Sequence, residues 1–202
     1  PSSRASSRIW SCKMTEREEF LDIFHRYVTR PGSEKLLDWL DTKTDFFTAP
    51  ASTRFHGAYD GGLCAHSLNV YRVLRSSFFE PDTDTEETYA IVALLHDLCK
   101  IDQYRHPIKE TLYVGSEETT IYDEQAWEYN PNTLVKGHGD KSVILLSQHM
   151  TLTEEESMCI LYHMGAFTDK EHWRSFTDAV HKFPNVLWTH HADMIASHVV
   201  GV

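Results

Sequence analysis

Apolar residues recur every three or four positions along most of this chain, which is the spacing of amphipathic α-helices. The pattern predicts helices at about 15–28, 33–40, 63–79, 85–100, 139–150, 154–164, 169–182 and 185–199. In a capping box, the residue that starts a helix and the residue three positions later exchange hydrogen bonds with the backbone. Three such boxes support helix starts: Thr15 with Glu18, Asp84 with Glu87, and Thr153 with Glu156. We therefore predict an all-α fold, built as a single-domain helical bundle.

Residues 101–137 break this pattern, because helical spacing gives way to scattered prolines and glycines. We expect a long irregular excursion here, in which the short stretches 111–114 and 119–122 can pair as a small hairpin. An excursion of this length in a compact domain is usually functional, for example as a lid. No internal repeat and no linker is evident, so residues 14–202 are predicted to form one domain.

The N-terminal stretch 1–13 is rich in serine and arginine and has no apolar core of the kind found in secretory signals. Met14 begins a sequence that reads as a natural start. We therefore interpret residues 1–13 as a vector-derived tail, with a disordered natural arm as the alternative.

Polar residues stand on three helix faces where the spacing calls for apolar ones. His66 lies in the apolar stripe of the 63–79 helix, the pair His96-Asp97 ends the apolar 85–100 helix, and Asp193 lies in the stripe of the last helix. An unpaired buried carboxylate is very costly, so buried charges are paired or bind metal. A single buried histidine is usually just hydrogen-bonded in the core. Together, these four residues favour one shared cation.

The same residues carry a resemblance to a known family. The chain resembles the HD-domain metal-dependent phosphohydrolase superfamily, in the subgroup whose metal ligands follow the order His, His-Asp, His, His, Asp. The matching segments contain His66, His96 with Asp97, His138, His163 and Asp193: GGLCAHSLNV, ALLHDLCK, LVKGHGDKS, ILYHMGAF and HHADMIAS. An isolated His-Asp pair carries little information, whereas six positions in this order, each in a suitable helical context, are a specific signal.

The resemblance implies two metal ions in an HD-type helical bundle. By analogy, His66, His96, Asp97 and Asp193 hold the first metal, and Asp97 bridges to the second. His138 and His163 would complete the second metal. Because this ligand set contains nitrogen and oxygen without sulfur, Mn, Fe, Co, Ni and Zn all remain open.

Four further residues are expected near a bound phosphate. Lys100 follows Asp97 by one helical turn, and the resemblance includes variants in which this lysine helps bind phosphate; the alternative is a solvated lysine at a helix end. Asp97 and Lys100 are our candidate catalytic residues, because Lys100 would offset the charge that develops on the phosphate. Lys141 lies at a helix start, where backbone N–H groups suit an anion, although its neighbours can simply open the helix. Arg54 could bind a phosphate in a bidentate manner. His56 is a candidate for contact with substrate.

Composition narrows the choice of partners. The formal net charge is −11, which argues against long duplex nucleic acid, and 13 histidines favour a metal. No apolar run is long enough for a membrane helix. The cysteines form no CxxC pair and are interpreted as reduced core thiols of a cytoplasmic protein: Cys12, Cys64, Cys99 and Cys159. Oligomeric state is left open.

These observations predict a metal-dependent phosphohydrolase. Its substrate would be a small phosphorylated molecule, such as a nucleotide or phosphate ester, attacked by a hydroxide that bridges two divalent transition metals. One alternative is a di-iron oxygenase, because the same ligand order resembles an oxygenase branch of the HD fold. The other is a non-catalytic, metal-dependent binding protein.

Overall fold

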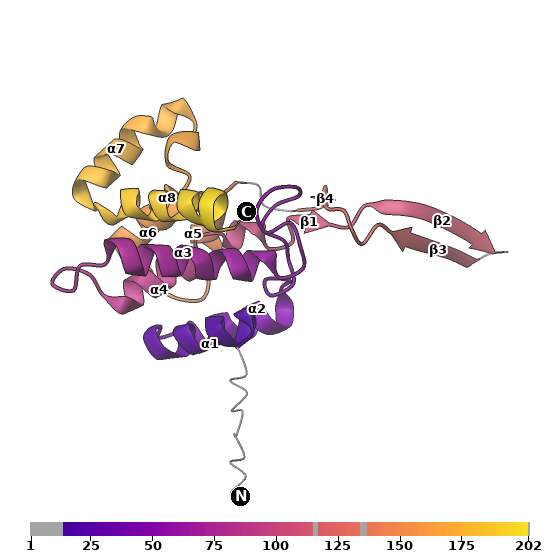
Figure 1. Ribbon diagram of the computed structural model, residues 1–202, viewed down its shortest axis with the longest axis horizontal. Coiled ribbons are helices and arrows are strands. Elements are labelled where there is room, and N and C mark those ends of the chain that lie inside the picture. The colour runs from indigo at the N-terminus through magenta and orange to yellow at the C-terminus, as the bar shows by residue number, and fades with distance from the viewer. Residues whose placement is uncertain (1–13, 115–116, 134–136, 202) are drawn as a thin grey trace, which may run out of the picture.

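The computed structural model describes residues 14–114, 117–133 and 137–201. Within these ranges the chain is mainly helical, and two small antiparallel sheets accompany the helices (Figure 1). The helices are α1 (Glu16–Tyr27), α2 (Ser33–Lys43), α3 (Gly62–Phe78), α4 (Glu86–Leu95), α5 (Gly139–Ser147), α6 (Glu154–Leu161), α7 (Trp173–Lys182) and α8 (Asn185–Ile195). The prediction of a mainly helical fold is therefore confirmed, while strands accompany the helices in the excursion over 101–137.

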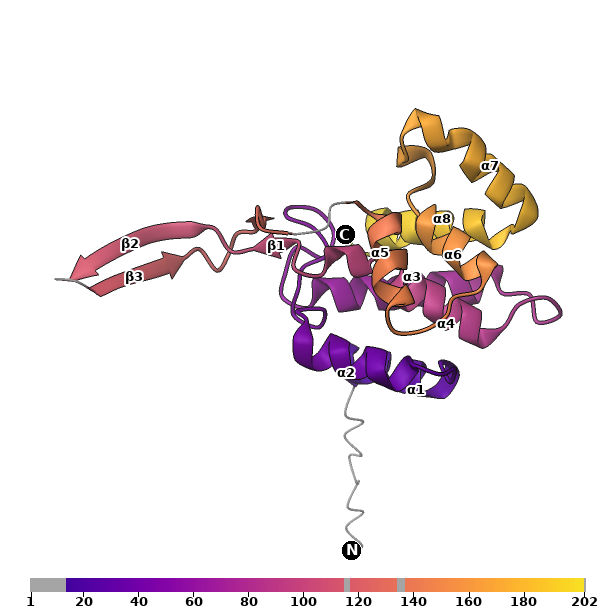
Figure 2. The same cartoon turned by 180° about the vertical axis from the view of Figure 1, so that it is seen from behind.

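Helices α3 and α4 form the centre of the bundle. They pack against each other, with α1 and α2 on one side and α5, α6 and α8 on the other (Figures 1 and 2). Every residue of α4 from Tyr89 to Leu95 is buried, as expected for a helix that is apolar all round. The central position of these two helices places His66 and the end of α4 inside the protein.

Two of the three predicted capping boxes are present. The boxes at Thr15 and Thr153 form as the sequence predicts. The box of Asp84 with Glu87 is wrong, because Thr85 caps α4 instead: its hydroxyl accepts the backbone N–H of Thr88 at 3.1 Å. Tertiary partners explain the difference, since Glu87 accepts the backbone N–H of Thr29 at 2.8 Å, and Asp84 accepts the hydroxyl of Tyr89 at 3.0 Å.

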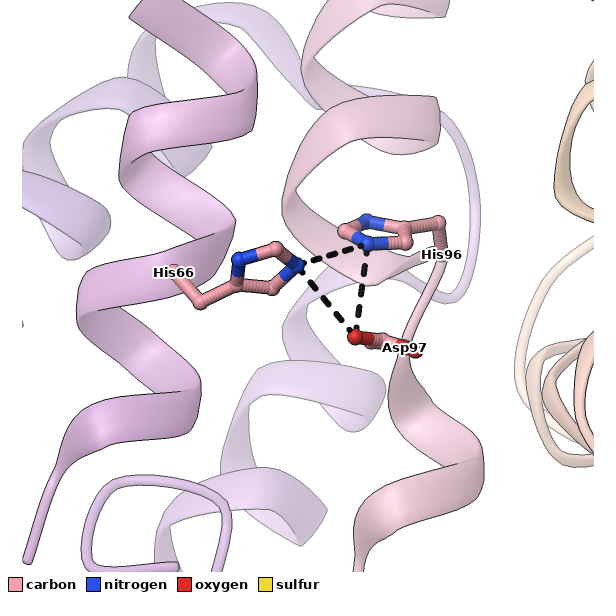
Figure 3. Close-up of side chains that lie close together, drawn as sticks. All are labelled: His66, His96 and Asp97. Atoms are coloured by element: carbon pink, nitrogen blue, oxygen red, sulfur yellow. Dashed lines mark hydrogen bonds and ion pairs between the residues drawn. The ribbon is translucent and has the colours of Figure 1, made fainter. Parts of the chain in front are cut away.

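The α4 helix ends five residues earlier than predicted. It stops at Leu95, His96 caps it, and a 3₁₀ turn follows at Leu98–Lys100. The backbone of Asp97, with φ −101° and ψ 22°, separates the two. Adjacent residues of a continuous helix point about 100° apart. This break therefore allows both His96 and Asp97 to face α3 (Figure 3).

The excursion over 101–137 is more regular than predicted. Strands β2 (Ile108–Val114) and β3 (Glu117–Tyr122) form an antiparallel hairpin that includes both predicted stretches. It projects away from the helices in both views (Figures 1 and 2). At its base, β1 (Tyr104–Arg105) pairs with β4 (Glu128–Tyr129), which connects the hairpin to the bundle.

Three cysteines of the described residues are buried and free of disulfides, as predicted: Cys64, Cys99 and Cys159. Cys12 and the whole predicted tail at 1–13 lie outside the described residues. No helix in the described part of the chain is long and apolar enough to cross a membrane.

Candidate metal centre

The structure brings polar side chains from α3, the end of α4 and α8 into one buried cluster. The Nε2 atom of His66 lies 3.3 Å from Nε2 of His96 and 3.4 Å from Oδ2 of Asp97 (Figure 3). Nε2 of His96 lies 3.5 Å from the same oxygen. Oδ1 of Asp193 approaches Nε2 of His66 to 3.1 Å. Three of these side chains are almost completely buried, and Asp193 is 15% exposed.

These distances match the spacing of ligands around one metal ion. Bonds of about 2.0–2.1 Å to nitrogen and oxygen, arranged as a tetrahedron, place ligand atoms about 3.3–3.4 Å apart. The three atoms of His66, His96 and Asp97 are separated by 3.3, 3.4 and 3.5 Å. The group could therefore hold a metal ion with little rearrangement.

The proton positions of two histidines leave lone pairs facing the cluster. Nδ1 of His96 lies 2.9 Å from the carbonyl oxygen of Ala93, and Nδ1 of His163 lies 2.7 Å from that of Ile160. A carbonyl only accepts, so Nδ1 carries the proton in each ring. When Nδ1 carries the only proton of the ring, Nε2 presents a lone pair toward Asp97. Metal-binding histidines are oriented in this way by a partner behind the ring.

A second group of ligand atoms surrounds the other oxygen of Asp97. Nε2 of His163 lies 3.4 Å from Oδ1 and, among the described residues, has no hydrogen-bond partner although it is buried. Asp97, Cys99 and His138 also form a group that could hold a metal ion. The carboxylate of Asp97 therefore lies between the two groups, with one oxygen toward each.

Lys100 contacts the same carboxylate. Its Nζ atom lies 2.6 Å from Oδ2 of Asp97, and its side chain is 10% exposed. Burial alone lowers the pKa of Lys100, but the charge of Asp97 outweighs this effect and raises the pKa above its usual value. Lys100 is therefore a fixed positive charge beside the cluster.

The charges of the cluster depend on one another. Burial alone raises the pKa of Asp97 and of Asp193, but Lys100 beside the former and His66 beside the latter hold both below the usual range. Burial alone lowers the pKa of His66, and hydrogen bonds to the two carboxylates raise it overall. A proton on His66 thus partly compensates the carboxylates when no metal is bound.

The cluster opens onto a cavity of about 430 Å³. Asp97, Lys100, His138 and Asp193 are among the residues that line it. Its other walls include Tyr104 and Tyr129 from the base of the hairpin, together with the side chains Phe55, His56, Met164, Phe167, His190, Met194, Ser197 and His198. A volume of this size lies within the range of small-molecule sites. A neighbouring cavity of about 510 Å³ shares His138, Met164 and Phe167 with it.

Two of the four predicted phosphate-binding residues line this cavity, and the other two do not. Lys100 and His56 line the cavity. Burial, reinforced by the nearby charges of His66 and Lys100, lowers the pKa of His56 to about 4, so this ring is neutral at pH 7. Arg54 is exposed and is not among the residues that line this cavity. Lys141 is buried, and its amine donates to the carbonyl groups of Cys99 at 2.5 Å and Ile101 at 3.3 Å.

Sequence reasoning missed Cys99 and Tyr104 as members of the site. Cys99 stands in an apolar stretch, and its position two residues after Asp97 was the available signal. Tyr104 and Tyr129 pair across β1 and β4, with ring centres 5.3 Å apart, which the sequence does not reveal. Nδ1 of His190 donates to the carbonyl of His163 at 2.9 Å and so supports that residue from behind.

Comparison with family models, curated proteins and solved structures finds no match to this chain. The case for metal binding therefore rests on the residues themselves. They form a buried cluster of histidine, aspartate and cysteine side chains that could hold a metal ion.

Proposed function

We propose that this protein is an HD-type metal-dependent phosphohydrolase that acts on a small phosphorylated molecule, such as a nucleotide or phosphate ester. One observation carries the proposal: Asp97 directs each of its oxygens toward a different group of metal-ligand atoms, at the wall of a cavity that Lys100 also lines. Two adjacent metal positions that share a carboxylate suit phosphoryl chemistry.

The expected cofactor is a pair of divalent transition metals, with His66, His96, Asp97 and Asp193 on one side and His138 and His163 on the other. When bound, such metals supply Lewis acidity and lower the pKa of a bound water. The chain itself supplies the orientation, because carbonyl oxygens behind His96 and His163 fix both rings.

Lys100 is the group best placed to bind the transferred phosphoryl group. Its amine is held beside Asp97, and it lines the cavity. A fixed cation in a partly desolvated site stabilises the negative charge that develops on phosphate oxygens. We therefore assign to Lys100 both substrate binding and transition-state stabilisation.

The cavity favours a small substrate with an apolar or planar part. Tyr104 and Tyr129 form an aromatic wall to one side of Lys100, and a nucleobase stacks well on such rings. His56 is neutral at pH 7 and can hydrogen-bond a sugar or phosphate ester group without adding charge. The net charge of −11 disfavours binding of long duplex nucleic acid.

The test is phosphate release by metal-depleted protein reconstituted separately with Mn, Fe, Co, Ni or Zn, against a panel of nucleotides and phosphate esters. We expect release that depends on added metal. Lys100→Met should lower kcat/KM by about 10²–10³-fold while metal content is retained. The matched control is Lys109→Met, because Lys109 is an exposed lysine on the projecting hairpin.

Two outcomes would overturn the proposed function, and a third would overturn the role assigned to Lys100. No phosphate release with any metal, together with bound metal, would favour a non-catalytic binding protein. A coloured protein with iron at two per chain that consumes O₂ would favour the di-iron oxygenase. Equal activity of Lys100→Met and wild type would remove Lys100 from the mechanism.

A further inference from the structure

The thiol of Cys99 lies between two candidate metal ligands. Its Sγ atom is 3.6 Å from Oδ1 of Asp97 and 3.7 Å from Nδ1 of His138. The residue is completely buried. Cysteine thiols on apolar stretches are normally inert core residues, so this position beside a carboxylate and an imidazole needs an explanation.

A second observation points to a ligand at the same place. Nε2 of His163 is buried, has no hydrogen-bond partner among the described residues, and lies 3.4 Å from the oxygen of Asp97 that Cys99 approaches. Its proton lies on the opposite nitrogen, which donates to Ile160. A buried ring nitrogen without a hydrogen-bond partner is costly, and a metal ion bound between it and the carboxylate would satisfy both groups.

The distances agree with a mixed ligand set. With metal–sulfur bonds of about 2.3 Å and metal–nitrogen or metal–oxygen bonds of about 2.1 Å, tetrahedral geometry separates sulfur from nitrogen or oxygen by about 3.6 Å, and nitrogen from oxygen by about 3.4 Å. The observed separations from Sγ are 3.6 and 3.7 Å, which agrees with the group of Asp97, Cys99 and His138. His163 lies outside this group of three and approaches it through Asp97, at 3.4 Å.

The backbone of Cys99 is held firmly in this position by α5. Its N–H donates to the hydroxyl of Ser142 at 2.9 Å, and its carbonyl accepts from Lys141 at 2.5 Å. His138 immediately precedes the same helix. One helix start therefore positions both the thiol and the imidazole, and this gives the buried Lys141 a positioning role.

We propose that Cys99 is a thiolate ligand of the second metal position, together with Asp97, His138 and His163. On binding, the thiol proton passes to solvent as the metal–sulfur bond forms, and no oxidation state changes. A sulfur ligand favours Zn²⁺, Co²⁺ or Fe²⁺ over Mn²⁺ and Mg²⁺. The inference rests on the metal binding in the proposed function and narrows the choice of metal.

The test is a spectroscopic titration of metal-free protein with Co²⁺, because a cobalt–thiolate bond produces an intense charge-transfer band in the near ultraviolet. We expect this band in wild type with the second equivalent bound. Cys99→Ser should lose the band and bind its second equivalent about 10–100-fold more weakly. The matched control is Cys64→Ser, which changes another buried free thiol and should keep the band.

A further variant keeps the test decisive if Cys99→Ser fails to fold. Cys12→Ser/Cys64→Ser/Cys159→Ser leaves Cys99 as the single thiol of the chain, and the band must persist. Two bound cobalt ions without the band in wild type would overturn the thiolate assignment and leave the proposed function standing. Absence of cobalt binding would overturn both.

Discussion

The helical bundle contains two buried clusters of charged and polar side chains. They differ in whether hydrogen-bond donors of the chain satisfy their acceptors. In the first, Arg30 lies between Glu87 in the first turn of α4 and Glu156 of α6. In the second, Asp97 lies among His66, His96 and His163. Both lie where the bundle excludes most water, and yet only the first is complete as it stands.

The Arg30 cluster satisfies its carboxylates with hydrogen-bond donors of the chain. Glu156 has a fully buried side chain, and its oxygens accept four hydrogen bonds: two from the Arg30 guanidinium, one from Thr88 and one from the backbone of Thr153. Bidentate arginine–carboxylate pairs are strong and geometrically specific. We interpret this cluster as structural.

The Asp97 cluster instead leaves a buried ring nitrogen without a hydrogen-bond partner in the described part of the chain. This nitrogen is Nε2 of His163, and Lys100 supplies one fixed positive charge. The comparison teaches that burial and charge alone do not distinguish a ligand site from a structural ion pair. What distinguishes them is whether the donors of the chain already satisfy the acceptors.

The largest expected effect comes from removing the charge of Asp97. Asp97→Asn keeps the shape of the side chain but removes the carboxylate that both groups share. We expect phosphate release to fall at least about 10⁴-fold, or about 5 kcal/mol in activation free energy. Asp41→Asn, a change in an exposed ion pair, should leave the rate within about twofold. Steady-state kinetics at saturating metal measure both, and an active Asp97→Asn would remove the shared carboxylate from the mechanism.

Breaking the Arg30 cluster should lower the stability of the protein without changing the rate of phosphate release. Arg30→Met leaves the buried Glu156 without its guanidinium partner, so we expect the free energy of unfolding to fall by about 3–5 kcal/mol. Denaturant unfolding monitored by circular dichroism measures this. A loss below about 1 kcal/mol would mean that the Arg30 cluster does not stabilise the fold.

Metal removal should affect the second cluster alone. With free metal at about 100 times its Kd, chelation should lower the free energy of unfolding by about 2.7 kcal/mol for each site. The same decrement should appear in Arg30→Met, because independent sites contribute additively. Thermal unfolding with and without chelator tests this, and a chelator effect that disappears in Arg30→Met would show that the two clusters are coupled.

The smallest effect is expected for a matched arginine on the surface. Arg26 pairs with Asp22 at 2.6 Å on α1, and both side chains are largely exposed. Arg26→Met should leave the free energy of unfolding nearly unchanged, because solvent and salt screen an exposed ion pair. A loss equal to that of Arg30→Met would show that burial does not separate the two arginine pairs.

Sequence reasoning succeeded where local pattern decides the structure. The boxes at Thr15 and Thr153 depend on residues three positions apart, and the apolar face around His66 marks it as buried. Sequence reasoning failed where the partners of a residue are distant in sequence. The 3₁₀ turn after Asp97 and the pairing of Glu87 with Arg30 both depend on tertiary contacts.

The candidate site could be predicted only in part from the sequence. Charges on apolar faces identify Asp97 and Asp193 from sequence alone, because burying them requires compensation. Cys99 was interpreted as a core thiol, since an apolar neighbourhood gives the same signal for a ligand and for a packed side chain. The inward-facing amine of Lys141 was equally hidden, because its acceptors are backbone carbonyls of a distant turn.

Metal content tests the central claim most directly. Purified wild type is saturated with Zn²⁺ or Co²⁺, passed through a desalting column and measured by inductively coupled plasma mass spectrometry beside Asp97→Asn. We predict about two ions per wild-type chain and nearly none in the folded variant, because the shared carboxylate is lost. Wild type that retains no metal, or a folded Asp97→Asn that retains as much as wild type, would contradict the account.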